Sequence, residues 1–188
     1  MTDATAGDHA RIPVLLTPWS VEDLTLLHHS NSPAMTSHTG GPETEEALLK
    51  RQHRYEALSA RPAEEGRMFR VSLEESGEPV GSVGYWPRTW QGEEVYETGY
   101  GILPEFQGRG LGVAALRAVA RAAAEAGGRR KLHAYPSVDN AASNAVLQKA
   151  GFELLGKVEF EYPPGHEIVS HDWCLDLHPV AGAADPAE

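Results

Sequence analysis

The residues with the clearest chemical potential are the glycines of the segment 107–112. Gly108, Gly110 and Gly112 alternate with other residues just before an alanine-rich stretch that is typical of a helix. The first amides of a helix have no partners within it and lie at the positive end of its dipole. Glycines let an anionic oxygen reach such amides without meeting a side chain. The segment therefore predicts a loop that binds phosphate oxygens, to which Arg109 could add a charged contact.

Other kinds of glycine-rich loop require residues or spacings that differ from those found here. A Walker A loop requires Gly-Lys-Ser or Gly-Lys-Thr after its glycines, and neither follows here. A dinucleotide-binding fingerprint spaces its glycines Gly-x-Gly-x-x-Gly and has an acid at the end of the next strand. Here the spacing is Gly-x-Gly-x-Gly, and Glu125 falls inside the predicted helix. A turn that merely starts a helix and binds nothing would carry the same glycines, so the loop alone does not decide.

The composition is that of one globular domain. The chain has 188 residues, of which 41% are hydrophobic, which is enough for one core but little for two. We expect the domain at 11–178 and disordered tails at 1–10 and 179–188, since both ends are rich in Ala, Gly, Asp and Pro. No apolar run approaches the roughly 20 residues that cross a bilayer, and the start has no signal-like block. We therefore expect no membrane contact and a cytoplasmic location.

Charge and the reactive side chains narrow the chemistry further. A formal net charge of −11 disfavours nucleic acid as a partner and weakly favours a cationic substrate such as an amine. Cys174 is the only cysteine and falls in an alternating strand pattern, which favours a small core residue over a nucleophile. His133, His166 and His171 match no tight metal-ligand spacing, so we expect no metal site.

Hydrophobic periodicity predicts a mixed order of strands and helices. Alternation predicts strands at 12–16, 68–73, 80–86, 95–103, 132–135, 152–162 and 167–177, with a looser segment at 87–93. Helical spacing and capping residues predict helices from Ser20 to about Pro33, over 43–60, over 111–126 and from 140 to 150. The strand–helix–strand unit from Tyr96 to Tyr135 should place its two strands parallel.

Two segments together resemble a known family. Residues 97–112, Glu-Thr-Gly-Tyr-Gly-Ile-Leu-Pro-Glu-Phe-Gln-Gly-Arg-Gly-Leu-Gly, resemble the acetyl-CoA motif of the GNAT superfamily of N-acetyltransferases, whose core is Gln/Arg-x-x-Gly-x-Gly/Ala. Residues 139–153 resemble its second motif, in the form of the ribosomal-protein N-terminal acetyltransferase-like branch. The resemblance implies an α/β (α+β) GNAT fold, with a mixed sheet of about seven strands, a splayed parallel pair at the cofactor site and about four flanking helices.

The same resemblance implies where acetyl-CoA would bind. Backbone groups of Gly101, Ile102 and Leu103 would pair with the pantetheine arm, which would lie like an added strand in the splayed gap. Asn140 would hydrogen-bond the cofactor near its thiol end, with Ser143 close by, although Asn140 fits a plain helix cap equally well. The pyrophosphate would lie on the amides of the loop formed by Gln107, Gly108, Arg109, Gly110, Leu111 and Gly112.

The resemblance also implies catalytic roles. An alkyl ammonium has a pKa near ~10, so its attack on a thioester needs a base or a proton-accepting water chain. Glu97 is the candidate base, because several family members carry a glutamate there; nearby glutamates leave a plain surface acid as the rival interpretation. The tyrosine that commonly protonates the thiolate is replaced by Leu147. Ser143 is the nearest substitute for it and Tyr135 a remoter one.

These observations favour an enzyme that moves acetyl from acetyl-CoA to a primary amine by direct attack, on a small molecule or a protein N-terminus. Leu147 keeps an alternative open, a non-catalytic module that senses acyl-CoA. A nucleotide-binding oxidoreductase is disfavoured by the glycine spacing. Family habit suggests a homodimer. Trp86, Trp90 and Tyr96 could line an acceptor pocket or fill the core, and we expect Trp86 in the core and Trp90 more exposed.

Overall fold

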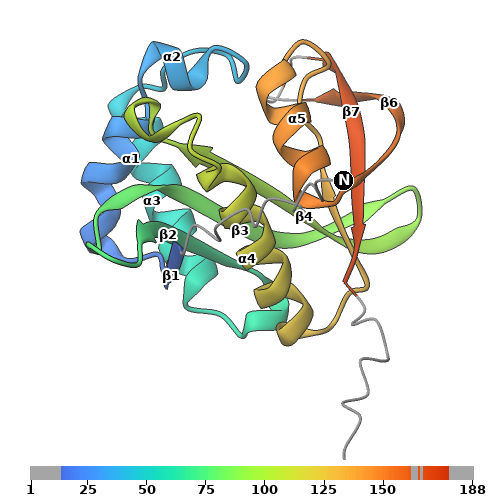
Figure 1. Cartoon of the computed structure of the whole chain (residues 1–188), viewed down its shortest axis with the longest axis horizontal. Coiled ribbons are helices and arrows are strands. Elements are labelled where there is room, and N and C mark those ends of the chain that lie inside the picture. The colour runs from blue at the N-terminus through green and yellow to red at the C-terminus, as the bar shows by residue number, and fades with distance from the viewer. Residues whose placement is uncertain (1–13, 162–164, 166, 178–188) are drawn as a thin grey trace, which may run out of the picture.

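The computed structural model describes residues 14–161, 165 and 167–177. Its centre is a seven-stranded sheet in the order β1-β2-β3-β4-β5-β7-β6 (Figure 1). β4 and β5 pair in parallel, and every other neighbouring pair is antiparallel. The strands are β1 Val14–Pro18, β2 Arg67–Leu73, β3 Pro79–Trp90, β4 Glu93–Ile102, β5 Lys131–Ala134, β6 Glu153–Glu161 and β7 Glu167–Asp176. The mixed sheet with a parallel pair that the sequence predicts is confirmed.

Four helical segments begin at a residue whose side chain caps them. Ser20, Ser32, Thr44 and Asn140 each accept a hydrogen bond from a backbone amide of the turn that follows, which satisfies a donor left over by the first turn. Pro33 begins a short helix rather than ending one, since a first-turn residue needs no amide hydrogen. The helices are α1 Leu24–Ser30, α2 Pro33–Thr36, α3 Glu45–Ser59, α4 Leu111–Ala126 and α5 Ala141–Ala150, with 3-10 turns η1 Val21–Asp23, η2 Ala63–Glu65 and η3 Pro104–Phe106.

Helices cover the sheet on both faces. The apolar side of α4 packs with Tyr85, Tyr96 and Leu132 in the larger core cluster. Gly84 precedes Tyr85 on β3, and a Cβ at Gly84 would lie on the other face of the sheet, 2.4 Å from the sulfur of Met68. Met68 belongs to the second cluster, formed with α1 and α3. Figure 1 shows α1, α2 and α3 on the side of β1 and β2, and α5 beside β7.

The segment 87–93, predicted to be loose, is a long β-hairpin instead. β3 continues to Trp90 and pairs with β4 from Gly81 to Trp90, and Gln91 and Gly92 form the turn with φ of 49° and 82°. Positive φ at both central residues is typical of the tight turns that match strand twist. Pro87 is tolerated because β2 pairs with β3 only as far as Tyr85, so the proline needs no donor on that side.

Several sequence expectations fall outside the described residues. They are the two tails, the start of the first strand at Ile12 and the turn at Pro163 and Pro164, together with His166. Within the described part of the chain, no helix is long and apolar enough to cross a membrane. Cys174 is half-buried on β7 and is not among the buried core residues, so it does not take the core position that its pattern favours.

Candidate functional site

The parallel strands β4 and β5 separate soon after they pair. Their register ends with Glu97 opposite His133. Beyond that pair β4 continues to Ile102, whereas β5 ends at Ala134. The remainder of β4 stays paired with β3 on one edge and faces a gap on the other. β4 and β5 thus form the splayed parallel pair that the family resemblance implies.

Leu103 is engaged within the protein. Its amide donates to the Val80 carbonyl at 2.8 Å, and its carbonyl accepts from the Phe106 amide at 2.9 Å. The Leu103 amide is therefore unavailable to a cofactor, whereas the carbonyl keeps a second lone pair that a ligand could use.

Ile102 faces the opposite way and lies on the edge of the gap. Its carbonyl accepts from Gln107 Nε2 at 2.8 Å, and the same nitrogen lies 3.6 Å from Met35 Sδ. Hydrogen-bonding direction alternates along a strand, so Tyr100 shares the edge with Ile102, whereas Gly101 turns its backbone groups toward β3. Gly101 instead leaves room above the strand, since a Cβ there would lie 3.2 Å from Met35 Cε.

The glycine loop presents unengaged amides at the start of α4. Gly108 and Gly110 have φ of 74° and 78°, the left-handed region that glycine adopts without strain. Among the described residues, no carbonyl or side chain accepts from the amides of 108–112. Position 112 favours glycine for lack of space, because a Cβ there would lie 3.2 Å from side-chain atoms of both Tyr100 and Val146. The loop thus has the donors and the open approach that an anion needs.

The side chains of the loop point away from these amides. Leu111 is buried in the main core and can offer only its backbone. Arg109 donates to the Glu105 carbonyl at 3.0 Å and lies over the Phe106 ring, with 5.4 Å from its guanidinium carbon to the ring centroid. A contact from Arg109 to a bound anion would require this exposed side chain to change rotamer.

Asn140 is the N-cap of α5, as the sequence predicts. Its Oδ1 accepts from the Ser143 amide at 3.0 Å. This leaves the Nδ2 hydrogens, for which the described residues provide no acceptor, available to a ligand. Asn140 and Ser143 both line the large cavity described below.

Tyr100 contacts Ser143 and was not singled out by sequence reasoning. Its hydroxyl donates to Ser143 Oγ at 3.3 Å. Burial raises the pKa of Tyr100 above its usual value, and the hydrogen bond to Ser143 offsets this only in part. Leu147, at the position of the family tyrosine, is buried in the core on the same helix. Tyr100 and Ser143 thus place a hydrogen-bonded pair of hydroxyls at the cavity.

Glu97 faces the cavity and is the only carboxylate among its described lining residues. Its Oε2 lies 2.7 Å from Arg88 Nη1, and its side chain is 16% exposed. Glu93 and Glu94, near the hairpin tip, instead pair with Lys131 and Arg129 at the surface. Of these three glutamates, Glu97 is the one that lines the cavity.

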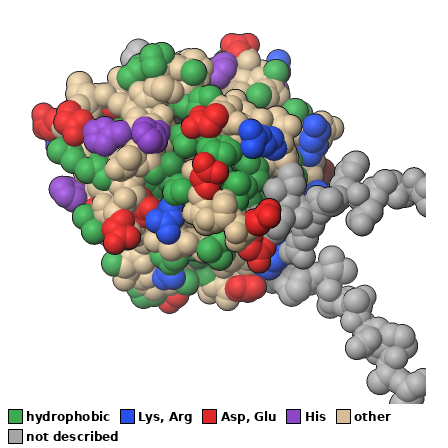
Figure 2. Space-filling model, turned by 60° about the vertical axis from the view of Figure 1, so that its left-hand side comes forward, with side chains coloured by type: hydrophobic (Ala, Val, Ile, Leu, Met, Phe, Trp, Pro, Cys, Tyr) green, Lys and Arg blue, Asp and Glu red, His purple; other side chains and the backbone are tan. Residues whose placement is uncertain are grey.

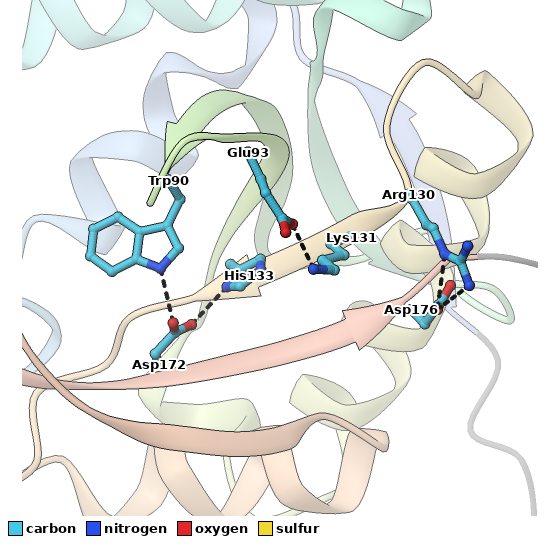
Figure 3. Close-up of polar contacts among 7 residues, drawn as sticks. All are labelled: Trp90, Glu93, Arg130, Lys131, His133, Asp172 and Asp176. Carbon is cyan, nitrogen blue, oxygen red and sulfur yellow. Dashed lines mark hydrogen bonds and ion pairs between the residues drawn. The ribbon is translucent and has the colours of Figure 1, made fainter.

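Arg88 is held by a network that extends across β5 and β7. Its guanidinium carbon lies 5.1 Å from the ring centroids of both Trp90 and Tyr135. Trp90 Nε1 donates to Asp172 Oδ2 at 2.9 Å, and Asp172 Oδ1 lies 2.7 Å from His133 Nδ1. Figure 3 shows Trp90 and His133 converging on the one carboxylate of Asp172 from different strands. The network fixes the wall behind Glu97.

His133 is structural rather than solvated. It is 3% exposed, and its ring stacks on Tyr135 with 5.9 Å between ring centroids. Burial lowers the pKa of His133, but the hydrogen bond to Asp172 and the neighbouring Cys174 outweigh this and raise the pKa to about 9. His171 binds Asn144 Oδ1 at 2.7 Å. No group of three or more His, Cys, Asp and Glu in the described part of the chain could hold a metal ion.

Of the three aromatic residues, Trp86 differs from expectation. Tyr96 is fully buried in the core. Trp86, expected in the core, is half-buried and lines the cavity, where its Cη2 would lie 3.0 Å from a Cβ at Gly99. Trp90, expected to be more exposed, is half-buried against Tyr135. Glycine at position 99 leaves the space that the edge of the Trp86 ring occupies.

These groups surround one cavity of about 300 Å³ between the gap and the helices α2 and α3. It joins the edge of β4 and the start of α5 with residues from the opposite wall. Those facing residues include Met35, His38, Thr39, Arg51 and Tyr55. On the face in Figure 2, acidic and basic side chains are interspersed, and no continuous basic patch is visible.

Comparison with known proteins identifies the family. Residues 14–153 match the model of the acetyltransferase (GNAT) domain, and the chain therefore belongs to this family of acetyltransferases. No curated protein sequence matches the chain significantly.

Solved structures with this fold are numerous and distant in sequence. Aminoglycoside acetyltransferase AAC(6')-Ib in complex with coenzyme A has a TM-score of 0.70 at 22% identity, covering 87% of this chain and 95% of that one. RimL, a ribosomal alpha-N-protein acetyltransferase in complex with coenzyme A, has a TM-score of 0.70 at 21% identity, covering 88% and 97%. MccE, a microcin C7 self-immunity acetyltransferase in complex with acetyl-CoA and AMP, has 0.70 at 16% identity, covering 87% and 92%.

Proposed function

We propose that this acetyltransferase transfers acetyl from acetyl-CoA to a primary amine by direct attack. The observation that carries the proposal is the alignment of three features along one path: unengaged amides at 108–112, the open edge of β4, and a cavity into which Glu97 points. A diphosphate fits the first, an extended polar arm the second, and an amine the third.

The residues would hold the cofactor as follows. The amides of Gly108 to Gly112 would bind the pyrophosphate, and the backbone of Tyr100 and Ile102 would bind the pantetheine arm. Gln107 would keep its contact to the Ile102 carbonyl or give it up to the arm. Asn140 Nδ2 would bind near the thiol end. Acetyl-CoA would supply the acetyl group as a thioester.

Proton transfer would involve two groups on β4. Glu97 would accept, directly or through water, the proton that the attacking nitrogen loses. Arg88 would keep the Glu97 carboxylate oriented toward the cavity. The hydroxyl pair of Tyr100 and Ser143 would donate the proton or hydrogen bond that the departing thiolate gains when the carbon–sulfur bond breaks. This pair stands in for the tyrosine that Leu147 replaces.

The test is amine-dependent thiol release. The full chain is incubated with acetyl-CoA and a panel of primary amines, including peptides with a free N-terminus, while free thiol is measured. We expect release with at least one amine and a large loss of rate in Glu97→Gln. Tight acetyl-CoA binding without release for any amine would instead support the acyl-CoA sensor that Leu147 keeps open.

We also propose a homodimer, on family habit alone, which a monomeric mass by sedimentation would contradict.

A further inference from the structure

The charges of the cavity are already paired. Glu97, its one described carboxylate, is bound to Arg88, and Arg51 on the facing wall is bound to Glu43. Each cation is therefore matched by an anion within contact distance. A second or third positive charge brought in by a ligand would find no uncompensated carboxylate among the described lining residues.

Part of the cavity wall is aromatic, between lining residues that are mostly polar but uncharged. Trp86 lines the cavity with the edge of its ring against Gly99, Tyr135 lies against the Arg88 guanidinium, and Tyr55 lines the cavity from α3. The half-buried Tyr55 ring is fixed edge-on against Trp19, with 5.4 Å between ring centroids. Aromatic rings of this kind offer contact area to aromatic or apolar groups.

Size points the same way. The cavity of about 300 Å³ is at the small end for ligand sites, and it includes the space beside Asn140 and Ser143. Under the proposed function, that part would be taken by the thioester end of the cofactor. The acceptor therefore has only the part next to Trp86 and Tyr55.

We propose, on the basis of the N-acetyltransferase function above, that the acceptor carries a single primary amine on an uncharged body with a flat apolar surface. Polyamines and aminoglycosides are excluded as good acceptors. Each extra ammonium would leave water without gaining a partner, and an unpaired charge in a partly buried site is strongly unfavourable. The single amine, in contrast, meets the one carboxylate that can take its proton.

The experiment compares acceptors on the full chain at fixed acetyl-CoA. The probes are 2-phenylethylamine, an amidated tripeptide with N-terminal phenylalanine, spermidine and kanamycin, measured by thiol release. We expect kcat/KM for the better monoamine to exceed that of either polycation by about tenfold or more. The first two probes also separate a small molecule from a peptide N-terminus. A polycation with the highest kcat/KM would overturn the inference while leaving the proposed function intact.

A measurement of probe affinity tests the inference even if no probe is acetylated. Calorimetric titration measures binding of each probe to the protein saturated with coenzyme A. If no probe releases thiol, the proposed function fails, but tighter binding of the monoamines would still support the cavity chemistry. Equal or tighter binding of spermidine would overturn it.

Charge insertion supplies a matched pair of variants. Thr39 lines the cavity, whereas Ser37, in the same exposed loop, does not. Thr39→Asp should raise the ratio of spermidine to 2-phenylethylamine activity by about fivefold or more, because it adds an unpaired carboxylate where the extra ammonium would lie. Ser37→Asp changes the net charge equally and should leave the ratio within about twofold. An equal rise in both variants would contradict a local effect.

Discussion

The Arg88 guanidinium and the Glu97 carboxylate form an ion pair across the β3–β4 hairpin, with 2.7 Å between Nη1 and Oε2. The pair places the single described carboxylate of the cavity against a cation that is itself packed on Trp90 and Tyr135. The candidate base is therefore fixed in position by residues from both sides of the splayed strands.

Glu97→Gln should lower kcat/KM for the amine by about 100-fold, since the amide cannot accept the proton that the nitrogen loses. Coenzyme A affinity should stay within about twofold, because Glu97 lies away from the phosphate loop. Glu94→Gln is the control: it removes a carboxylate of the same strand that binds Thr89 and Arg129 outside the cavity. Similar losses in both variants would remove the special role of Glu97.

Tyr100→Phe should lower kcat by about tenfold, since the departing thiolate loses a donor but remains a tolerable leaving group. The double variant with Ser143→Ala should be no slower than the worse single variant, because one hydrogen-bonded pair acts as a unit. Tyr135→Phe serves as the comparison, as the remoter hydroxyl. Additive losses in the double variant, or a larger loss from Tyr135→Phe, would contradict the assignment.

The His133–Asp172 pair should make stability depend on pH. The pKa of His133 is about 9 in the folded state and about 6.5 when unfolded, so its contribution is complete below pH 6.5 and is lost as pH rises through 9. The upper limit of that loss is about 3 kcal/mol of unfolding free energy. Urea unfolding at pH 6.5 and 9.5 measures it. Asp172→Asn should flatten the dependence, and an unchanged slope in that variant would contradict the coupling.

Gly81→Ala should destabilise the fold by about 3 kcal/mol, because overpacking forces the backbone to shift. A Cβ at Gly81 would lie 2.1 Å from the Gly101 carbonyl oxygen, on the strand that borders the gap. Gly156→Ala, on β6, has a positive φ but nothing within 4 Å of its Cβ and should cost less. Chemical denaturation of both variants decides, and a smaller loss for Gly81→Ala would contradict this packing.

Local sequence signals predicted the elements whose ends are marked by capping residues or glycines. Asn140 and Gly151 delimit α5 by capping, and the run of alanines with the glycines before it defines α4. The β3 extension was missed because Pro87 is a strand breaker except at an unpaired edge, which only the length of β2 reveals. The prediction of Leu103 as a backbone ligand could not take account of the bond from its amide to Val80, because that contact depends on how β4 pairs with β3.

The network behind Glu97 depends on contacts between residues far apart in the chain. His133 and Asp172 meet only because β5 pairs with β7, and Trp90 reaches them across the hairpin end. No local pattern encodes those contacts, and a lone histidine in a strand is compatible with many partners. The same holds for Tyr100 and Ser143, which come from β4 and α5.

Calorimetric titration of coenzyme A tests the central claim most directly, since the account depends on the amides of 108–112 binding a diphosphate. Wild type should bind, Gly110→Ala should bind several-fold more weakly because φ of 78° strains a side chain, and Gly110→Asp should bind about 100-fold more weakly because a like charge is added. Undiminished affinity in Gly110→Asp, with the fold intact by circular dichroism, would contradict the phosphate loop and the acetyl-CoA site built on it.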